Sequence, residues 1–412
     1  MATIRNFFVI DPDREVRSLF QRILESMGYS FVTLQETNES ALEQMVQRQT
    51  HFLIINWRLT PMPGMVFLQK VRQSPKFRFV PTVILSKQMA GPDLRLATEL
   101  GLKSILPVGA DPADIKKAIS ALIEAEEKLH PDFVKLRAAA QLVMEGKSDE
   151  ALPLLAECHK SMPKSPEAAR LLGEVLSNRE DWQAAEVVIE PAHIANEADV
   201  NLAQILAKIY SRTGRQKEAI QLLGQLSEYS PLNISTLLGL GQAFEQDGNA
   251  EKAKAAFSQA RTLDPDDAEA SSGLGRIAVG EGKYEEALQY FKDPKSNGEI
   301  VRIFNNSGVA AVHKGDLPRA FECYRAAISM LVDNPNLYRV RYNLGLALRS
   351  QGELLEAFNV FVECIETPIA EKAYASLRRV SQELEKAGQI VDKAKLHAAG
   401  VKIMSLRGKA GS

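Results

Sequence analysis

A glycine that recurs at a nearly constant interval constrains this chain more than any other feature of its sequence. Gly214, Gly248 and Gly282 are equally spaced, and Gly315 follows only one position early. An alanine stands five positions after each of these glycines, at residues 219, 253, 287 and 320. The segments between them have the apolar spacing of helices and almost no strand-like run. The period therefore predicts stacked helix pairs that form a solenoid.

The clearest repeat lies in the middle of the chain. Residues 234–267 read ISTLLGLGQAFEQDGNAEKAKAAFSQARTLDPDD. This unit resembles the tetratricopeptide repeat, in which two antiparallel helices pack closely because small residues face each other. Two backward steps of the same interval from Gly214 reach Glu180 and Gly146, and an alanine again follows each after five positions. The repetition therefore extends well before the clearest unit.

The ends of the repeat region are less regular. The last unit, residues 371–406, keeps Gly388 but has Lys393 where the packing alanine is expected, as in a solvent-facing cap. We expect a tetratricopeptide solenoid of about seven to eight repeats over residues 133–406. Residues 407–412 are expected to form a tail.

The segment 1–129 has a different pattern. Short β-rich runs alternate with helical segments, and these runs read FFVI, FLII, VPTVILS and SILPV. Strands that recur between helices of this length indicate βαβ units and a parallel sheet covered on both faces. We expect a doubly wound α/β domain with five parallel strands and five helices over residues 1–129, followed by the all-α solenoid.

This segment resembles the receiver domain of response regulators, the CheY-like fold, over its whole length. The resemblance implies a pocket in which acidic residues bind magnesium, an aspartate accepts a phosphoryl group, and a hydroxyl and a lysine recognise the phosphate. The corresponding positions here are Asp11, Pro12, Asn56, Ser86 and Val108. The Asn56 amide is neutral and too weakly nucleophilic to form an acyl phosphate. We therefore predict a degenerate receiver without phosphoryl transfer or tight magnesium binding.

Two questions about this domain stay open from the sequence. Lys87 either forms an ion pair with Asp11 in place of the lost lysine or is a solvated loop residue. The resemblance implies that a receiver without its nucleophile still docks to a protein or to a second copy, often through its last helix, here residues 114–129. The alternative is a domain that only caps the first repeat.

The tetratricopeptide resemblance also implies a groove lined by the first helix of each repeat. Its groove-facing positions carry arginines, amides and a tyrosine: Arg276, Arg302, Asn305, Asn306, Arg339, Tyr342, Asn343 and Arg349. Guanidinium groups pair with carboxylates bidentately, and asparagine amides bind a peptide main chain. We therefore predict that an acidic peptide or protein segment binds there. The alternative is that these residues only solvate an exposed helix face.

The sequence gives no support for catalysis, a metal site or a cofactor. The six histidines show no HxxxH or HExxH spacing, and GxGxxG, Walker and GxSxG motifs are absent. Cys158, Cys323 and Cys364 are far apart, which argues against a zinc site or a disulfide framework. A net charge of −2 gives no basic excess for nucleic acid, and no apolar run approaches the roughly 18 residues of a membrane helix. We expect a non-enzymatic cytoplasmic protein.

Two functions remain compatible with the sequence. The first is an adaptor in bacterial signalling, with a phosphorylation-silent receiver and a tetratricopeptide groove that binds a protein partner. The second is a response regulator of a phosphorelay, in which Asp11, Asp13 or Ser86 supports phosphorylation and the receiver controls access to the groove. The missing carboxylate at Asn56 and the missing lysine at Val108 favour the adaptor.

Overall fold

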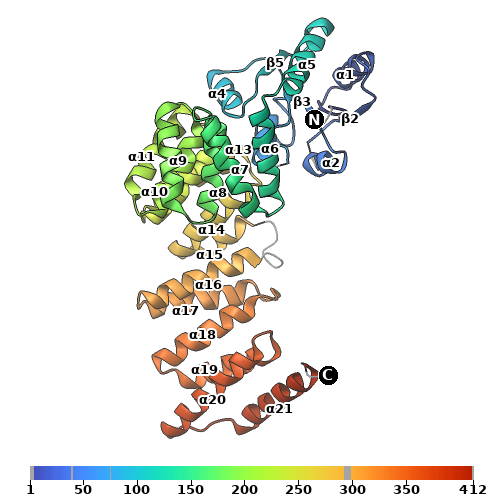
Figure 1. The fold of residues 1–412 in the computed structure, drawn as a ribbon. Coiled ribbons are helices and arrows are strands. Elements are labelled where there is room, and N and C mark those ends of the chain that lie inside the picture. Colours follow the sequence, from blue (N-terminus) through green and yellow to red (C-terminus); the bar gives the residue numbers. More distant parts are fainter. Residues whose placement is uncertain (1–3, 39, 75, 292–297, 411–412) are drawn as a thin grey trace. The chain divides into compact units, whose positions relative to one another are not determined.

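The computed structural model describes residues 4–38, 40–74, 76–291 and 298–410 (Figure 1). The chain divides into two compact units, Met1–Pro265 (unit 1) and Asp266–Ser412 (unit 2). Unit 1 contains a sheet and the first helix pairs, and unit 2 contains helices throughout its described part. Among the described residues, none of the helices combines the length and the apolar character needed to cross a bilayer.

Unit 1 begins with a parallel sheet whose strands have the order β2-β1-β3-β4-β5. Its strands are β1 (Asn6–Ile10), β2 (Phe31–Gln35), β3 (Phe52–Asn56), β4 (Thr82–Ser86) and β5 (Ser104–Pro107). The central strands β1 and β3 are buried on both faces, which explains their nearly continuous apolar sequences. The predicted five-stranded doubly wound α/β fold is confirmed.

Five helices of the described chain accompany this sheet. They are α1 (Arg14–Ser26), α2 (Ala41–Gln47), α3 (Gly64–Gln73), α4 (Gly91–Glu99) and α5 (Pro112–Glu127). Helices α1 and α5 pack on one face, where Phe20 and Ile119 belong to one apolar cluster with Phe7 and Ile54 of the strands. Because that cluster also includes residues of β4, it joins the sheet and both helices into one core.

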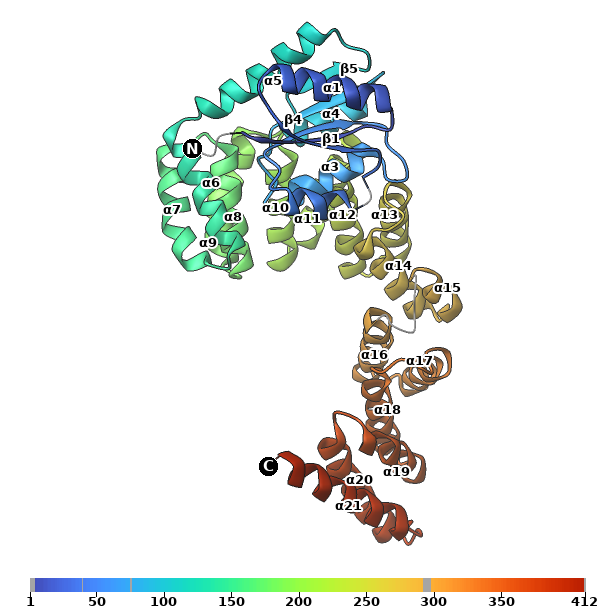
Figure 2. The same cartoon turned by 90° about the vertical axis from the view of Figure 1, so that its right-hand side faces the viewer.

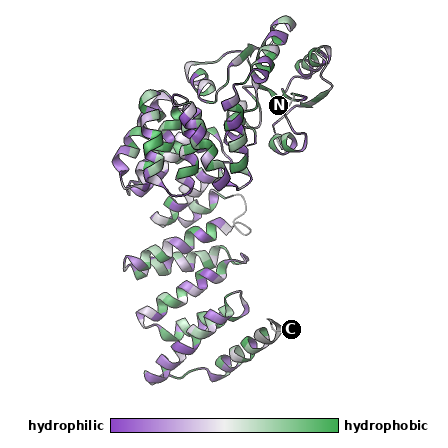
Figure 3. Cartoon of the chain, viewed as in Figure 1, coloured by the Kyte–Doolittle hydropathy of each residue, from purple (hydrophilic) through white to green (hydrophobic). Residues whose placement is uncertain are grey.

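The remaining helices of unit 1 form four pairs within the described residues. They are α6 (Pro131–Met144), α7 (Ser148–Ser161), α8 (Pro166–Asn178), α9 (Trp182–Ala195), α10 (Val200–Arg212), α11 (Gln216–Tyr229), α12 (Ile234–Gln246) and α13 (Ala250–Leu263). Hydrophobic and hydrophilic residues both occur along these helices (Figure 3), as expected of helices that bury one side. A Cβ atom on Gly241 would lie 2.7 Å from the Phe257 ring, so the close approach of α12 and α13 requires glycine there.

Unit 2 consists of four more helix pairs in its described part. They are α14 (Ala268–Glu281) with α15 (Tyr284–Gln289), α16 (Gly298–His313) with α17 (Leu317–Met330), α18 (Leu337–Gln351) with α19 (Leu354–Glu363), and α20 (Ala370–Lys386) with α21 (Lys393–Ala410). Helix α21 continues beyond residue 406, where the sequence suggested that a tail begins, and residues 411–412 lie outside the described part. The predicted all-α repeat region after the α/β domain is confirmed.

Within unit 1, the α/β domain lies along the repeats (Figure 2). Residues of α3 and of the end of α4 make hydrogen bonds, through side chains and one main-chain oxygen, with residues at or just before the starts of α10 and α12. Helix α5 leads into α6 after Lys128–His130. The elements that meet the first helices α10 and α12 are therefore α3 and α4.

Glu180 occupies the position that glycine holds in most repeats. Its φ angle is 61°, and Gly146 and Gly214, one repeat before and after it, have φ angles of 75° and 82°. This left-handed backbone conformation ends the first helix of the pair and is strained for a residue with a Cβ atom. Unit 1 thus tolerates one strained turn that its other repeats avoid.

We expect Glu180→Gly to stabilise unit 1 by roughly 0.5–1 kcal/mol, because relief of the left-handed strain exceeds the extra chain entropy of glycine. Denaturant unfolding of the full chain measures this change. Gly146→Ala is the matched control, because it adds a Cβ atom at the same left-handed position, and it is expected to destabilise by roughly 0.5–1 kcal/mol. Destabilisation by Glu180→Gly would contradict the assignment of strain to this turn.

Candidate functional site

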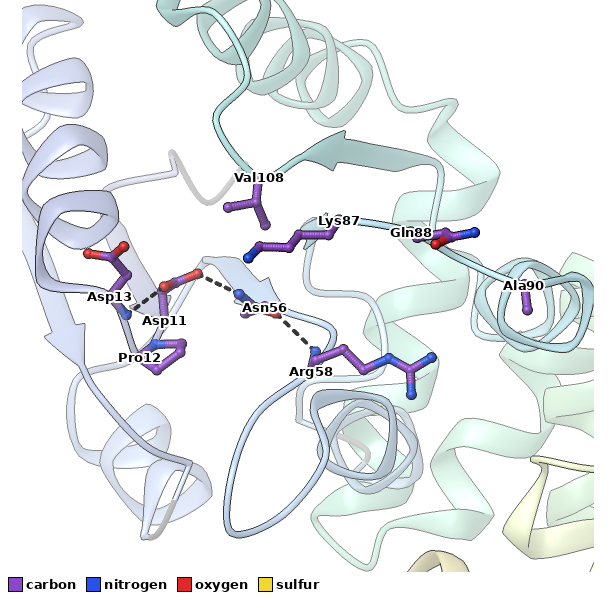
Figure 4. Close-up of a pocket in the computed structure, with 9 residues that line it drawn as sticks. All are labelled: Asp11, Pro12, Asp13, Asn56, Arg58, Lys87, Gln88, Ala90 and Val108. Atoms are coloured by element: carbon purple, nitrogen blue, oxygen red, sulfur yellow. Dashed lines mark hydrogen bonds between the residues drawn. The ribbon is translucent and has the colours of Figure 1, made fainter.

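Four of the five predicted pocket residues line one cavity of about 590 Å³ at the carboxyl ends of the strands (Figure 4). They are Asp11, Pro12, Asn56 and Val108, and the cavity is also lined by Asp13, Arg58, Lys87, Gln88 and Ala90. The fifth, Ser86, is buried, and its hydroxyl donates to the main-chain oxygen of Gln88 at 3.0 Å. Ser86 therefore stabilises its own loop and does not line the cavity.

Asn56 and Asp11 are hydrogen-bonded to each other in the pocket. The Asn56 Nδ2 donates to Asp11 Oδ2 at 2.9 Å, and its Oδ1 accepts from the main-chain N–H of Arg58 at 2.9 Å. The other Asp11 oxygen accepts from the main-chain N–H of Asp13 at 2.8 Å. Burial raises the pKa of the Asp11 carboxyl above its ordinary value, while the hydrogen bonds from Asn56 and Asp13 oppose this shift.

Lys87 and Val108, which also line the cavity, differ in character. Lys87 extends over the cavity from the loop after β4, with its ammonium on the side of Asp11 and Asn56 (Figure 4). Within the described residues, Lys87 and Asp11 do not form an ion pair, and the Lys87 side chain is exposed. This agrees with the interpretation of Lys87 as a solvated loop residue. Val108 places an apolar side chain where the resemblance implies a lysine.

These residues do not fit the magnesium site that the receiver resemblance implies. Magnesium requires several oxygen ligands in a nearly ideal octahedron. Asn56 turns its nitrogen toward Asp11, because its oxygen is held by the main chain of Arg58. Both Asp11 oxygens accept hydrogen bonds from the protein. Across the described residues, no group of three or more His, Cys, Asp or Glu side chains could hold a metal ion.

A buried tryptophan fixes the loop that follows Asn56. The Trp57 Nε1 donates to Asp93 Oδ1 at 2.8 Å, and both side chains are buried. The other Asp93 oxygen accepts from the main-chain N–H of Ala90 at 2.9 Å and pairs with Arg58 at 3.2 Å. This carboxylate therefore ties the loop after β3 to the start of α4. This contact could not be predicted from the sequence, because nothing local links Trp57 to a residue 36 positions away.

The second candidate site is the face formed by α14, α16, α18 and α20, the first-helix face of unit 2. Glycines with positive φ, Gly315, Gly352 and Gly388, end its last three helices and set a common register. Counted back from Gly315 and Gly352, equivalent positions are held by Arg302 and Arg339, by Asn305 and Tyr342, and by Asn306 and Asn343. The predicted residues therefore recur on equivalent positions of neighbouring helices.

The structure brings three of these residues, Asn305, Tyr342 and Asn343, into contact between adjacent helices. Asn343 Nδ2 donates to Asn305 Oδ1 at 2.7 Å, and the Tyr342 hydroxyl lies 3.2 Å from Ser376 Oγ. Asn305 also lies 3.5 Å from the Asn306 Oδ1. The face is thus an ordered layer of amides and hydroxyls.

Arg302 and Arg349, in contrast, are engaged by glutamates of their own unit. Arg302 forms two hydrogen bonds with Glu299, at 2.5 and 2.9 Å, and these lower the pKa of the Glu299 carboxyl. Arg349 binds both oxygens of Glu383 and lowers the pKa of that carboxyl in the same way. Another predicted arginine, Arg276, donates to Ser272 Oγ at 2.9 Å.

The register also reveals two arginines that sequence analysis missed. Counted back from Gly388, Arg378 and Arg379 occupy the positions of Tyr342 and Asn343, and both are exposed. They were overlooked because the last unit was interpreted as a cap. Their spacing from Gly388 equals that of Tyr342 and Asn343 from Gly352, and this spacing could have identified them from the sequence. With exposed Arg339, whose guanidinium lies against the Tyr338 ring, they form the basic part of this face.

The equivalent positions of unit 1 contact the α/β domain. Counted back from Gly214 and Gly248, Asn201 and Ser235 occupy the position that Arg302 and Arg339 hold in unit 2. The Asn201 Nδ2 donates to the main-chain oxygen of Glu99 at 3.3 Å, and the Ser235 Oγ accepts from Gln73 Nε2 at 2.9 Å. In unit 1, therefore, the first-helix face binds the surface of another folded domain.

Comparisons with known families assign the two parts of the chain. Residues 7–120 match the model of the response regulator receiver domain. Residues 142–209 and 238–300 match two models of the tetratricopeptide repeat. The chain therefore contains a receiver domain and tetratricopeptide repeats, a combination that suggests a signalling protein with repeats of a kind that generally mediate protein–protein interaction. Both kinds of domain are typically non-catalytic.

Individual relatives match parts of the chain. The BBSome complex member BBS4 of Bos taurus is 25% identical over 224 residues, which are 54% of this chain and 42% of that protein. A probable chemotaxis protein CheY of Rhizobium etli is 28% identical over 117 residues, which are 28% of this chain and 88% of that protein. A solved tetratricopeptide repeat protein from Parabacteroides merdae is 15% identical with a TM-score of 0.41, over 60% of this chain and 98% of that one. The chain thus spans less than half the length of BBS4.

We expect Asn56→Asp to destabilise the receiver by roughly 1–2 kcal/mol at pH 7, because it places a second carboxylate beside Asp11, where both cannot ionise freely. The repulsion raises the pKa of the pair above that in the unfolded chain, so the loss should shrink as the pH falls and one carboxylate binds a proton. Thermal unfolding at pH 7 and pH 4.5 measures both effects. Asn56→Ala removes the same hydrogen bond without adding charge and is the control. An equal loss at both pH values would contradict the expectation.

Proposed function

We propose that this chain is a non-enzymatic adaptor in bacterial signalling, with a phosphorylation-silent receiver and a first-helix face in unit 2 that binds a protein partner. One observation carries the partner-binding part of the proposal. In unit 1 the equivalent positions Asn201 and Ser235 already bind a protein surface, that of the receiver. The same scaffold positions in unit 2 carry the predicted partner-binding residues.

The silent state of the receiver is supported by the chemistry of its pocket. Phosphoryl transfer needs a carboxylate nucleophile and cations that neutralise the transferring oxygens. Asn56 supplies a neutral amide, and its nitrogen is already bonded to Asp11. Val108 supplies no charge, and the oxygen ligands do not fit a magnesium ion. The pocket therefore retains the shape of a receiver site without its reactive groups.

The residues on the unit 2 face favour an acidic segment as the partner. Arg339, Arg378 and Arg379 are exposed and lie on two neighbouring first helices, α18 and α20. Guanidinium groups present paired donors to carboxylates, and exposed positive charge accelerates association with an acidic partner. The Asn305–Asn343 pair lies on the same face and offers amide groups that suit a peptide main chain. We therefore assign this face to an extended acidic peptide.

A second candidate function is a response regulator whose receiver state controls the repeats. The observation that favours it is the preserved cavity of about 590 Å³, in which Asp11, Asp13 and Lys87 remain. A phosphoryl group on Asp13, on Asp11 or on Ser86 would then replace modification at Asn56. A second protein, or a second copy of the chain, docking to the receiver through residues 114–129 is compatible with either function.

Phosphorylation distinguishes the two functions directly. We expect incubation of the full chain with acetyl phosphate and magnesium to leave its intact mass unchanged, because Asn56 is not nucleophilic. Mass spectrometry after incubation measures this, with a receiver that retains its aspartate as the positive control for the reagent. A mass increase of one phosphoryl group would support the response regulator and contradict the silent receiver.

Partner capture tests the unit 2 face. We expect Arg339→Glu/Arg379→Glu to reduce capture of a specific partner from the native host at least tenfold, because both residues are exposed and the substitutions reverse the charge of the face. Affinity purification with quantitative mass spectrometry measures this. Arg302 and Arg349 are unsuitable targets, because their substitution would also break their pairs with Glu299 and Glu383.

The control for that experiment reverses two charges on second helices of the same unit. Arg325→Glu/Lys402→Glu produces the same change in net charge, and its two broken ion pairs are exposed, so they contribute little to stability. Circular dichroism and melting of both variants should stay near wild type. Equal capture by wild type and Arg339→Glu/Arg379→Glu would remove the unit 2 face as the binding site.

A further inference from the structure

The receiver binds the first-helix face of unit 1 through polar side chains of α3. Gln69 is buried, and its amide bridges the turn before α12: Nε2 donates to the main-chain oxygen of Leu232 at 3.1 Å, and Oε1 accepts from the main-chain N–H of Ile234 at 2.9 Å. The next residue, Lys70, pairs with buried Asp264 at 2.6 Å. A side-chain amide thus completes the first turn of α12, where helix N–H groups lack partners within their own helix.

The end of α4 places a carboxylate in the same surface. Glu99 Oε2 accepts from Ser230 Oγ at 2.9 Å and from Asn233 Nδ2 at 3.0 Å, and both donors are buried. The other oxygen, Oε1, is buried and lacks a hydrogen-bond partner among the described residues. Burial raises the pKa of the Glu99 carboxyl above its ordinary value, so the charged form is held at a cost in this interface.

Apolar side chains also lie at this contact: residues 64–69 of α3 are buried in succession, so no side of this part of the helix faces solvent. The apolar cluster on the α1–α5 side of the sheet, which contains Phe7 and Ile119, does not include residues of the repeats. Phe79, in the loop between α3 and β4, packs against the cluster of α6 to α8, and the Arg137 guanidinium lies 5.1 Å from its ring centre. Polar contacts between domains resemble those of transient complexes, because water can replace them when the surfaces separate. The polar contacts of this interface are therefore of the kind found in reversible complexes.

The chain also has a place at which the receiver can pivot. Helix α5 ends at Glu127 and α6 begins at Pro131, so Lys128–His130 connect the receiver to the repeats. Across this connection Arg137 pairs with Glu126, and both side chains are partly exposed. A pivot at these residues would separate α3 and α4 from the repeats without unfolding either domain.

We propose that the first-helix face of unit 1 is a second protein-binding surface, which the receiver covers reversibly in cis. The contacts of the receiver define which groups a partner of this face must supply. These are a carboxylate that reaches Ser230 and Asn233, and an ammonium group that reaches Asp264. A second copy of this chain, when open, presents this same set of groups. Opening therefore exposes two complementary surfaces, the α3–α4 face of the receiver and the face of the repeats.

Hydrogen exchange of the full chain tests the reversible cover. The amide of Ile234 reports on it, because its acceptor is Gln69 of the receiver, and the amide of Ile54 in β3 reports on unfolding of the receiver core. In wild type we expect Ile234 to exchange faster than Ile54. Lys70→Glu, which faces Asp264 with a like charge, should accelerate exchange at Ile234 at least tenfold and leave Ile54 unchanged. Lys117→Glu, the same charge reversal at an exposed site on α5, is the control.

A charge exchange tests the binding surface itself. In each of the variants Lys70→Glu and Asp264→Lys, residues 70 and 264 of one chain carry the same charge and repel each other. When the receiver of one variant binds the repeats of the other, residues 70 and 264 carry opposite charges in both contacts. We expect each variant alone to be open and monomeric. Their mixture should double in mass by light scattering and should recover protection of Ile234. The double variant Lys70→Glu/Asp264→Lys should recover protection as a monomer.

Three results would overturn the proposal. A common exchange rate for Ile234 and Ile54 in wild type and in Lys70→Glu would mean that the receiver never separates without unfolding. Failure of the double variant to recover protection would show that the pair does not hold the cover. A mixture that stays monomeric and unprotected would show that the surface accepts no separate protein.

If Asp264→Lys does not fold, Arg78→Glu and Glu174→Arg provide the same exchange, because this pair lies 2.8 Å apart across the interface. All of these substitutions leave the first-helix face of unit 2 unchanged. Failure of the reversible-cover proposal would therefore not contradict the proposed function.

Discussion

The close packing of two helices in each repeat is the constraint on which the rest of this structure depends. Phe257 lies so near the backbone of α12 that a Cβ atom on Gly241 would be 2.7 Å from its ring, and Tyr324 leaves still less room at Gly308. Helices fixed at this distance cannot rotate about their axes without a clash. The register of each first helix is therefore set, and with it the residues that the first-helix face presents.

The loops that line the receiver pocket lead directly into α3 and α4, the two helices that contact the repeats. Helix α3 begins at Gly64, where a Cβ atom would lie 2.0 Å from the main-chain oxygen of Asn56. Helix α4 begins beside Asp93, which holds Trp57 of the loop after Asn56. The loops that line the pocket thus position both helices that contact the repeats. An amide at residue 56 keeps these loops in one arrangement, because it bonds Asp11 and the Arg58 main chain without any ligand.

The sequence predicted the features that depend on local patterns. Apolar runs and glycine spacing identified the sheet and the helix pairs, and the strand-end position of Asn56 placed a neutral amide where the receiver resemblance implies an aspartate. Interactions between distant residues could not be predicted in this way. Glu99 and Asn233 are far apart in the chain, and neither stands out as more than an ordinary polar residue on a helix or turn. Arg379 was overlooked for a different reason, because an irregular last repeat was interpreted as a cap although Gly388 preserved its register.

Equivalent positions of the two units differ in chemistry, and the difference agrees with the partner proposed for unit 2. In unit 1 these positions carry the neutral residues Asn201 and Ser235, and their partner is tethered through the short connection Lys128–His130. A short tether keeps the effective concentration of the partner high, so weak polar contacts are enough to hold it. Exposed arginines such as Arg339 and Arg379 in unit 2 suit a partner that arrives from solution, since long-range attraction raises its rate of encounter. At these equivalent positions the helical scaffold holds its own receiver with neutral hydrogen bonds, beside the ion pair of Lys70 with Asp264, and in unit 2 it presents exposed positive charge.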